Sequence, residues 1–305
     1  MKKLLEKHIL VVFILLVTAV SSFAKSGIDL LPYESETVFY LSINKQKLKE
    51  LRKNKDIKKE LKTITRLGID LNKVKHMHGS VLSIKGRIAP DYIVVAEGSF
   101  NDSVIYAASK KHKVYSQSSH AGVSYLKSAN KNDLSLVILS GRFFVLAKDK
   151  HLKKVIDLFQ GKGKSVRHNR QMSTHLNAVS RANFVWVVVK ITPQMKKEIS
   201  ENEKYYSSLK NVEFVTVSYV SSGEDIITIN SICKYGRDVP EIKRFMKESI
   251  DMMALTLAMG FKDENTQNEV MKIGENAKYH TNGKTATVSI RINQKLIGIL
   301  LKGLK

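Results

Sequence analysis

Short apolar runs, each followed by a turn signal or an amphipathic segment, constrain the fold of this chain more than any other feature. Within residues 134–159 the runs LSLVILS and RFFVLAK flank Gly141, and DKHLKKVIDLF follows them. Runs rich in β-branched and aromatic residues around a glycine predict two paired strands. The spacing of Leu152, Val155 and Ile156 then predicts a helix with one apolar side. Such units bury their apolar faces by packing helices on a sheet.

The same kinds of element recur in a similar order in both halves of the chain. The segments that predict strands or hairpins are 38–43, 76–84, 91–97, 134–147, 184–191, 212–234 and 277–292. The segments that predict helices are 44–51, 56–67, 102–112, 149–159, 193–199, 238–260 and 293–304. Each half therefore predicts the order strand–helix, hairpin–helix, hairpin–helix. We predict an α+β fold of two related modules, 25–165 and 166–305, each a mostly antiparallel sheet with helices packed on one face.

The N-terminus has the layout of a secretory signal peptide. Three lysines lie among the first seven residues, an apolar run covers 9–20, and the small residues Ser22 and Ala24 precede a cleavage point. This pattern predicts a signal peptide over residues 1–24 and a secreted or periplasmic protein. An uncleaved anchor is the alternative, although the run is shorter than the roughly twenty residues that a membrane span requires.

The chain is strongly basic and has a single cysteine. Its net charge is +23, and loss of the signal segment lowers this by two. Such a surface attracts polyanions, namely nucleic acid, anionic headgroups or acidic cell-surface polymers. Lysine outnumbers arginine roughly four to one, whereas specific phosphate and base recognition favours arginine. Cys233 cannot form a disulfide within the chain, and the alternating pattern around it predicts a buried thiol.

The stretch from Gly161 to Ser165, GKGKS, resembles the end of a phosphate-binding loop. That loop requires a glycine five residues before the Gly-Lys-Ser triplet, a position held here by Leu158, and it follows a strand. Here the preceding element is the predicted helix 149–159, so we expect the glycines to form its C-terminal cap. We therefore predict no nucleotide and no other cofactor. The basic residues of this junction, Lys162, Lys164, Arg167 and Arg170, are the candidates for anion binding.

Few other residues suggest chemistry. His76 and His78 share one face of a predicted strand, which suits copper or zinc. No third ligand is identifiable nearby, so we predict no metal site, with this pair as the nearest candidate. The chain has no Gly-x-Ser-x-Gly and no His-Glu-x-x-His motif. Adjacent carboxylates such as Asp263–Glu264 are expected in loops.

Two further segments suggest surfaces. Residues 45–62 combine many lysines with apolar residues at helical spacing, which predicts a solvated helical face or, alternatively, a helix that lies on an anionic surface. Residues 252–260, MMALTLAMG, are apolar on most sides and predict a helix buried between sheet layers.

Three short motifs give the chain a resemblance to known proteins. They are Leu31-Pro32 with Thr37-Val38-Phe39, Leu67-Gly68-Ile69-Asp70, and the junction Gly161–Ser165. With them the chain resembles secreted bacterial proteins of uncharacterised function that have a signal peptide and a duplicated α+β module. The resemblance implies a structural role for the junction and no catalytic residue.

These features favour a non-enzymatic binding or envelope-associated protein over an enzyme. One alternative is a hydrolase or other enzyme whose site only the fold assembles, and another is a generic polyanion or nucleic-acid binder. The expected partner is an anionic envelope polymer or an envelope protein rather than a specific nucleic acid, with no transmembrane span after signal removal.

Overall fold

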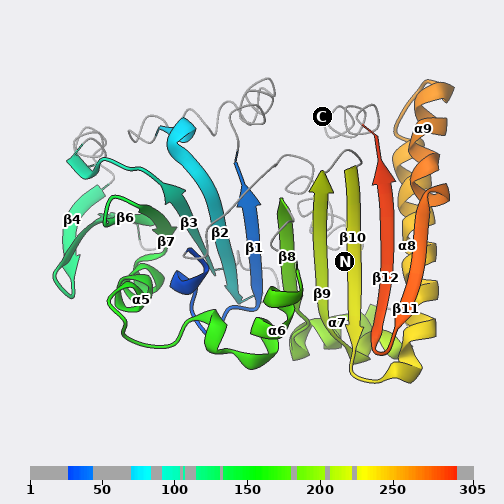
Figure 1. The fold of residues 1–305 in the computed structure, drawn as a ribbon, viewed down its shortest axis with the longest axis horizontal. Helices are drawn as coiled ribbons and strands as arrows, with labels where there is room; N and C mark the ends of the chain where they lie inside the picture. The colour runs from blue at the N-terminus through cyan, green and yellow to red at the C-terminus, as the bar shows by residue number, and fades with distance from the viewer. Residues whose placement is uncertain are drawn as a thin grey trace. The chain divides into compact units, whose positions relative to one another are not determined.

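The described part of the chain is an α+β protein built from antiparallel strands (Figure 1). The computed structural model describes residues 27–43, 70–83, 91–103, 106, 115–130, 133–179, 184–202, 207–221 and 225–293. They belong to two compact units, the N-terminal unit within residues 18–182 and the C-terminal unit within residues 183–305. The predicted fold class is confirmed.

Seven strands form the described sheet of the N-terminal unit. In spatial order they are β1 (Thr37–Ser42), β2 (Val74–Ser83), β3 (Asp91–Gly98), β7 (Phe143–Ala147), β6 (Ser135–Leu139), β5 (Val123–Ser128) and β4 (Tyr115–His120). The β6–β7 hairpin turns at Ser140 and Gly141, whose φ angles are 51° and 64°. Two successive left-handed residues make the type I′ turn that fits the twist of paired strands.

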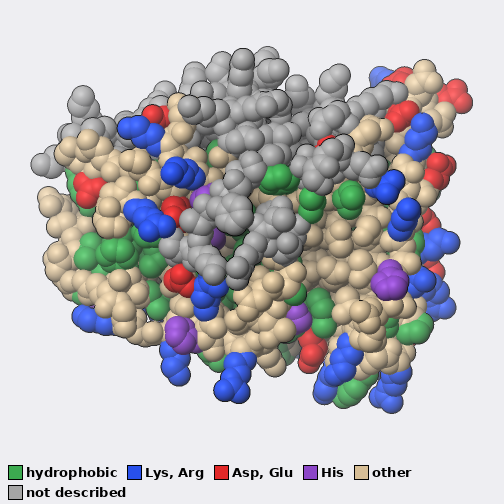
Figure 2. Space-filling model, viewed as in Figure 1, with side chains coloured by type: hydrophobic (Ala, Val, Ile, Leu, Met, Phe, Trp, Pro, Cys, Tyr) green, Lys and Arg blue, Asp and Glu red, His purple; other side chains and the backbone are tan. Residues whose placement is uncertain are grey.

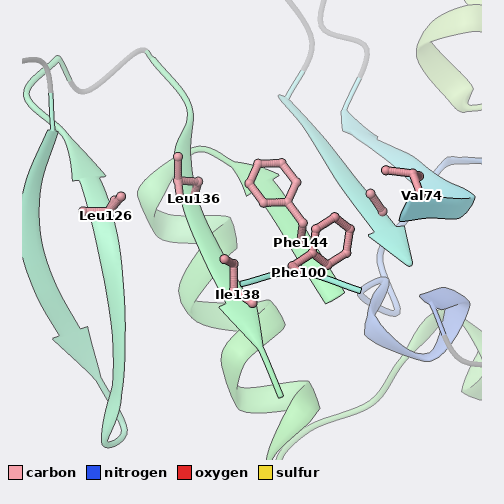
Figure 3. Packing of buried hydrophobic residues seen from close by; sticks show 7 residues of the cluster. Val74, Phe100, Leu126, Leu136, Ile138 and Phe144 are labelled. Atoms are coloured by element: carbon pink, nitrogen blue, oxygen red, sulfur yellow. The ribbon is translucent and has the colours of Figure 1, made fainter. Parts of the chain in front are cut away.

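The core of this unit lies around β6 and β7, which are buried on both faces. Helix α5 (Asp149–Phe159) packs on β5, β6 and β7 and buries Leu152, Val155 and Ile156 completely. A further cluster joins Phe100 and Phe144 to Ile138 and neighbouring aliphatic side chains (Figure 3). The 3-10 turns η2 (Leu71–Lys73) and η3 (Val166–His168) and the helix α6 (Arg170–Ala178) complete the unit, together with η1 (Gly27–Leu30).

Five strands form the described sheet of the C-terminal unit. Their order is β8 (Val185–Lys190), β9 (Val212–Ser221), β10 (Asp225–Cys233), β12 (Thr285–Ile292) and β11 (Ala277–Asn282). Helix α8 (Val239–Ala258) packs on β11 and β12, and α9 (Glu264–Glu275) packs on α8 and β12. Helix α7 (Pro193–Asn202) packs on η4 (Ser207–Asn211), and η5 (Gly236–Asp238) leads into α8.

The two sheets share one connectivity. The order β1-β2-β3-β7-β6 in the N-terminal unit corresponds to β8-β9-β10-β12-β11 in the C-terminal unit. In each sheet the first three strands are consecutive in the chain and adjacent in space. A hairpin later in the chain then adds its second strand beside the third of them, which is β7 beside β3 in one unit and β12 beside β10 in the other. The β4–β5 hairpin extends only the first sheet.

Two expectations about the C-terminal unit were wrong. Residues 252–260 are not buried between layers, because Met252, Leu255 and Met259 are 55%, 50% and 68% exposed. Asp263 and Glu264 do not lie in a loop pair, because Asp263 caps α9 by accepting the N–H of Thr266 at 2.8 Å and Glu264 is the first helical residue. No helix among the described residues has the length and apolar character to cross a membrane.

Several expectations lie outside the described residues. They concern the signal segment 1–24, the predicted helices 44–51, 56–67 and 293–304, and most of the predicted helix 102–112.

Candidate functional site

The glycine–lysine junction caps helix α5. Gly161 has a φ of 77°, its N–H donates to the carbonyl of Leu158 at 3.0 Å, and the N–H of Lys162 donates to the carbonyl of Asp157 at 2.8 Å. A left-handed glycine with two backward hydrogen bonds is the usual end of a helix. The predicted capping role is confirmed, and Ser165 at the end of the junction directly precedes the 3-10 turn η3.

The four candidate anion-binding residues follow this cap. Lys162 and Lys164 are exposed, and Arg170 is exposed at the start of α6. Arg167 is half-buried, and its Nε donates to a carboxylate oxygen of Asp29. Three cations therefore face solvent, while the fourth is committed to an ion pair that holds η1 against η3.

The two strand histidines lie in a buried polar row across β1 and β2. In the pairing register Tyr40 is opposite His78 and Ser42 is opposite His76. The hydroxyl of Tyr40 lies 3.0 Å from Nδ1 of His76, and its ring contacts that of His78 at a centroid distance of 5.1 Å. Burial, followed by the charges of His76 and Arg167, lowers the pKa of His78 to about 3. The imidazole is therefore neutral at pH 7.

His76 and His78, the nearest candidates for metal ligands, lie without a third ligand among the described residues. Within the described ranges no three His, Cys, Asp or Glu side chains come together to hold an ion. Glu97 lies opposite His76 on β3, but its carboxylate accepts Nε and an Nη of Arg142 at 3.0 and 2.6 Å. A carboxylate bound in this way is a partner for arginine rather than a free base.

The acidic groups around α5 also form contacts that attach this helix to the sheet. The carboxylate of Asp91 accepts hydrogen bonds from Nζ of Lys148 at 2.6 Å, Nζ of Lys150 at 2.7 Å and Nε2 of His151 at 2.9 Å. Hydrogen bonds from Lys148 first, and then from Lys150, hold the pKa of Asp91 well below its usual range. At its other end α5 is fixed by Asp157, which lies 2.9 Å from Nε2 of His120. These pairs fasten the helix to the sheet.

A cluster of basic residues around one tyrosine lies at the end of the C-terminal sheet. The chain leaves β10 as Lys234-Tyr235-Gly236-Arg237, and Tyr235 is 38% exposed. The Lys234 ammonium and the Arg237 guanidinium each lie 5.0 Å from the centre of the Tyr235 ring. Cations within about 6 Å of an aromatic face are attracted to it. The ring thus holds two cations in fixed positions.

Three segments converge to build this cluster. The N–H of Cys233 donates to the carbonyl of Lys284 at 2.8 Å, which fixes the β11–β12 turn beside the end of β10. The N–H of Lys234 donates to the carbonyl of Asn211, next to Lys210 on η4. We call Lys210, Lys234, Tyr235, Arg237 and Lys284 the basic corner; all five are exposed. Figure 2 shows basic side chains gathered where β10 runs into α8.

Two acids beneath the basic corner, Asp238 and Glu241, bind Ser208. The hydroxyl of Ser208 lies within hydrogen-bond distance of Asp238 Oδ1 (3.2 Å) and Glu241 Oε2 (2.8 Å). The Ser208 N–H also donates to Glu241, and the Ser208 bonds lower the pKa of that carboxyl. These carboxylates lie at the N-terminus of α8, where the helix dipole favours negative charge. The cations of the basic corner are exposed, and the charge of the nearby Glu213 acts on Lys234.

A row of hydroxyl and amide groups extends from the basic corner along the sheet. Asn230 donates to the hydroxyl of Thr216 at 3.0 Å and accepts that of Thr287 at 2.8 Å, which links β9, β10 and β12. Thr228 and Ser289 form the next pair, at 3.5 Å. Alternating residues of β12, such as Ala286 and Val288, are buried on the face that α8 covers. We call the side with Thr228, Asn230, Thr287 and Ser289, which are half-buried, the polar face; Thr216 beside Asn230 is only 4% exposed.

An exposed lysine and an exposed histidine border the polar face on its edge strand. In the pairing register Lys278 of β11 is opposite Ser289 and His280 is opposite Thr287. Arg291 is exposed at the end of β12 that is remote from the β11–β12 turn. Donors and acceptors on the strands therefore lie between positive charges at the corner and along the edge. This is a surface suited to a long ligand with both hydroxyl and anionic groups.

Sequence reasoning missed the basic corner and the polar face. The signal for the first was present in the tetrapeptide Lys234–Arg237, in which an aromatic residue lies between cations. The signal for the second was the threonine and serine residues that alternate with apolar ones in TATVSIRI.

Comparison with known proteins gives a fold likeness only. No protein-family model matches the chain, and no curated protein matches it. Among solved structures it is similar to crystal form III of TP0453, with a TM-score of 0.55 and 9% identity over 92% of this chain and 99% of that one. For crystal form IV of TP0453 the TM-score is 0.52 and the identity 10%, over 91% and 97% of the two chains. At these identities the likeness concerns the fold alone.

Proposed function

We propose that this chain is an exported, non-enzymatic binding protein that attaches to an anionic polymer of the cell envelope. The binding surface is the basic corner together with the polar face of the C-terminal unit. The N-terminal lysines and apolar run support export. The observation that carries the proposal is the Tyr235 ring, which is exposed and flanked by Lys234 and Arg237 at 5.0 Å.

The chemistry of the surface favours a polysaccharide with acidic groups over a nucleic acid. Lysine ammonium groups are point charges that attract carboxylate, sulfate or phosphate without selecting a base. The hydroxyl and amide groups of the polar face can exchange hydrogen bonds with sugar hydroxyls. Base stacking on single strands uses several aromatic rings in succession. The basic corner offers one such ring, Tyr235.

Salt-dependent binding to two polyanions tests this proposal. The probes are dextran sulfate and single-stranded DNA, titrated against the protein at several salt concentrations. The variant Lys234→Gln/Arg237→Gln/Lys284→Gln removes three charges from the basic corner. The control Lys162→Gln/Lys164→Gln/Arg170→Gln removes the same charge from the α5–α6 junction.

We expect the corner variant to lose at least tenfold in affinity for dextran sulfate. Its slope of log affinity against log salt should fall by about two to three, because fewer counterions are released. The junction variant should change both quantities by far less. Equal losses in the two variants would mean attraction by net charge alone and would refute a defined surface. Tighter binding of DNA than of dextran sulfate would favour a nucleic-acid role.

A further inference from the structure

The first described residues form a segment that covers part of the N-terminal sheet. We call residues 27–35 the N-terminal strap. It begins with η1, which packs on β2 and β3, and it buries Ile28, Leu30 and Leu31. The N–H of Val166 donates to the carbonyl of Leu31 at 2.7 Å. The N–H of Tyr33 donates to the carbonyl of Lys164 at 3.1 Å. The strap is thus held by apolar burial, by a short line of backbone bonds, and by the ion pairs Asp29–Arg167 and Glu34–Lys154.

His78 lies directly beneath the strap. A Cβ on Gly27 would lie 2.2 Å from Cδ2 and 2.9 Å from Nε2 of this imidazole, so the backbone of Gly27 is in contact with the ring. His78 is 3% exposed, and neither ring nitrogen has a hydrogen-bond partner among the described residues. Buried polar groups without partners are uncommon in proteins and call for an explanation.

The charged and titratable groups around His78 do not compensate a proton on it. Tyr40 of β1 and His76 of its own strand contact or flank the ring, and Glu97 of β3 lies one row away, bound to Arg142. From the strap and η3 come Asp29 and Arg167, which are paired with each other. An imidazolium here would have two N–H donors without acceptors, beside His76 and Arg167.

We propose that the N-terminal strap is released from the sheet at acidic pH, and that protonation of His78 drives this release. Protonation of His78 is unfavourable while Gly27 seals the ring from water, and it becomes favourable when the strap lifts and water solvates the imidazolium. Opening would also expose the apolar side chains of Ile28, Leu30 and Leu31 and their seat on the sheet. This inference is independent of the polymer-binding surface, which belongs to the other unit.

The direction and size of the pH effect on strap opening follow from the linkage between His78 protonation and the opening equilibrium. His78 has a lowered pKa of about 3 under the closed strap and an ordinary value of 6.5 when it is solvated. The closed state is therefore fully favoured above pH 6.5 and loses stability as the pH falls towards 3. Between pH 7 and pH 5 the opening equilibrium should rise about 25-fold if only His78 titrates.

Amide hydrogen exchange of the whole chain tests this inference. Exchange of peptides covering residues 28–35 is followed at pH 7.0 and pH 5.0, and each rate is divided by the intrinsic rate at that pH. In the wild-type protein we expect the corrected rate to rise about 25-fold, while the peptides of α5 change little. Equal corrected rates at both pH values would overturn the proposal.

Neutral replacements of His78 decide whether this residue is responsible. In His78→Gln and in His78→Phe, which keeps a ring, we expect a pH response below about threefold. His120→Gln, the matched control on β4, should respond like the wild type. Gly27→Ala should open the strap at both pH values, because the added Cβ cannot fit against the ring. If either folded His78 variant keeps the full response, the proposal is wrong.

NMR titration of the His78 ring in the wild type is a second test, and a pKa above 6 with the strap closed would also refute the proposal.

Discussion

Replacement of Asp91 by asparagine should destabilise the N-terminal unit, because this carboxylate holds the start of α5. Asp91 is 19% exposed and accepts Lys148, Lys150 and His151. The exposed fractions of these three partners are 22%, 66% and 9%, so their contributions to stability are expected to differ. An exposed ion pair contributes little, so Lys150 adds almost nothing, and the two shielded partners decide the effect.

The magnitude follows from those two contacts. A hydrogen bond to a charged group contributes about 1.5 kcal/mol at the lower end of the measured range. Two such bonds, weakened but not abolished by the asparagine amide, give an expected loss of about 2–3 kcal/mol in the free energy of unfolding. The pKa of Asp91 is lowered from 3.8, so its contribution is present at neutral pH and is lost as the pH falls below about 4.

Urea unfolding of wild type and Asp91→Asn at pH 7 and at pH 3.5 measures this effect. The control is Glu34→Gln, which removes the exposed partner of Lys154 on the same helix and should cost below about 0.5 kcal/mol. The difference between wild type and Asp91→Asn should shrink at the lower pH. An Asp91→Asn cost no larger than that of Glu34→Gln, or one that does not change with pH, would refute the assignment.

Three further outcomes are expected elsewhere in the chain. Gly98→Ala should lower the free energy of unfolding by about 2–4 kcal/mol, because a Cβ would lie 2.2 Å from the backbone oxygen of Lys73. Gly122→Ala meets no atom within 4 Å and should lower it by about 1 kcal/mol, because of the left-handed φ at this position. Urea unfolding compares the two variants, and equal losses would contradict the clash at Gly98. Leu152→Ala should cost about 2–5 kcal/mol by leaving a cavity under α5, and a loss below 1 kcal/mol would mean that α5 repacks. Cys233, whose pKa burial raises to about 11, should resist thiol reagents at pH 8 until the protein is unfolded, and rapid labelling of the native state would contradict its burial.

Most strands and hairpins were predictable because their signals are local, although the β4–β5 hairpin was not among the predicted segments. The β6–β7 hairpin needs only β-branched runs and a Gly141 that accepts a positive φ, and α5 begins and ends where its apolar spacing and its glycine cap predict. Helix α9 was missed because its two leading carboxylates suggested a loop. Its N-cap, Asp263, and the buried pair Val270 and Ile273 were the available signals.

The candidate sites were hard to predict because each depends on contacts between distant segments. The basic corner forms only when the β11–β12 turn meets the end of β10, so Lys284 cannot be placed beside Lys234 from local sequence. The burial of His78 depends on its register with Tyr40 and on Gly27. The exposure of Met252 and Met259 likewise depends on which side of α8 meets the sheet, and apolar composition alone suggested burial.

A hydrogen-exchange footprint of bound dextran sulfate on the wild-type chain tests the central claim most directly. The account predicts slowed exchange in peptides that contain residues 234–237 and 283–289, with the α5–α6 junction unchanged. Slowed exchange confined to residues 161–170, or none at all under saturating polymer, would contradict a binding surface on the C-terminal unit.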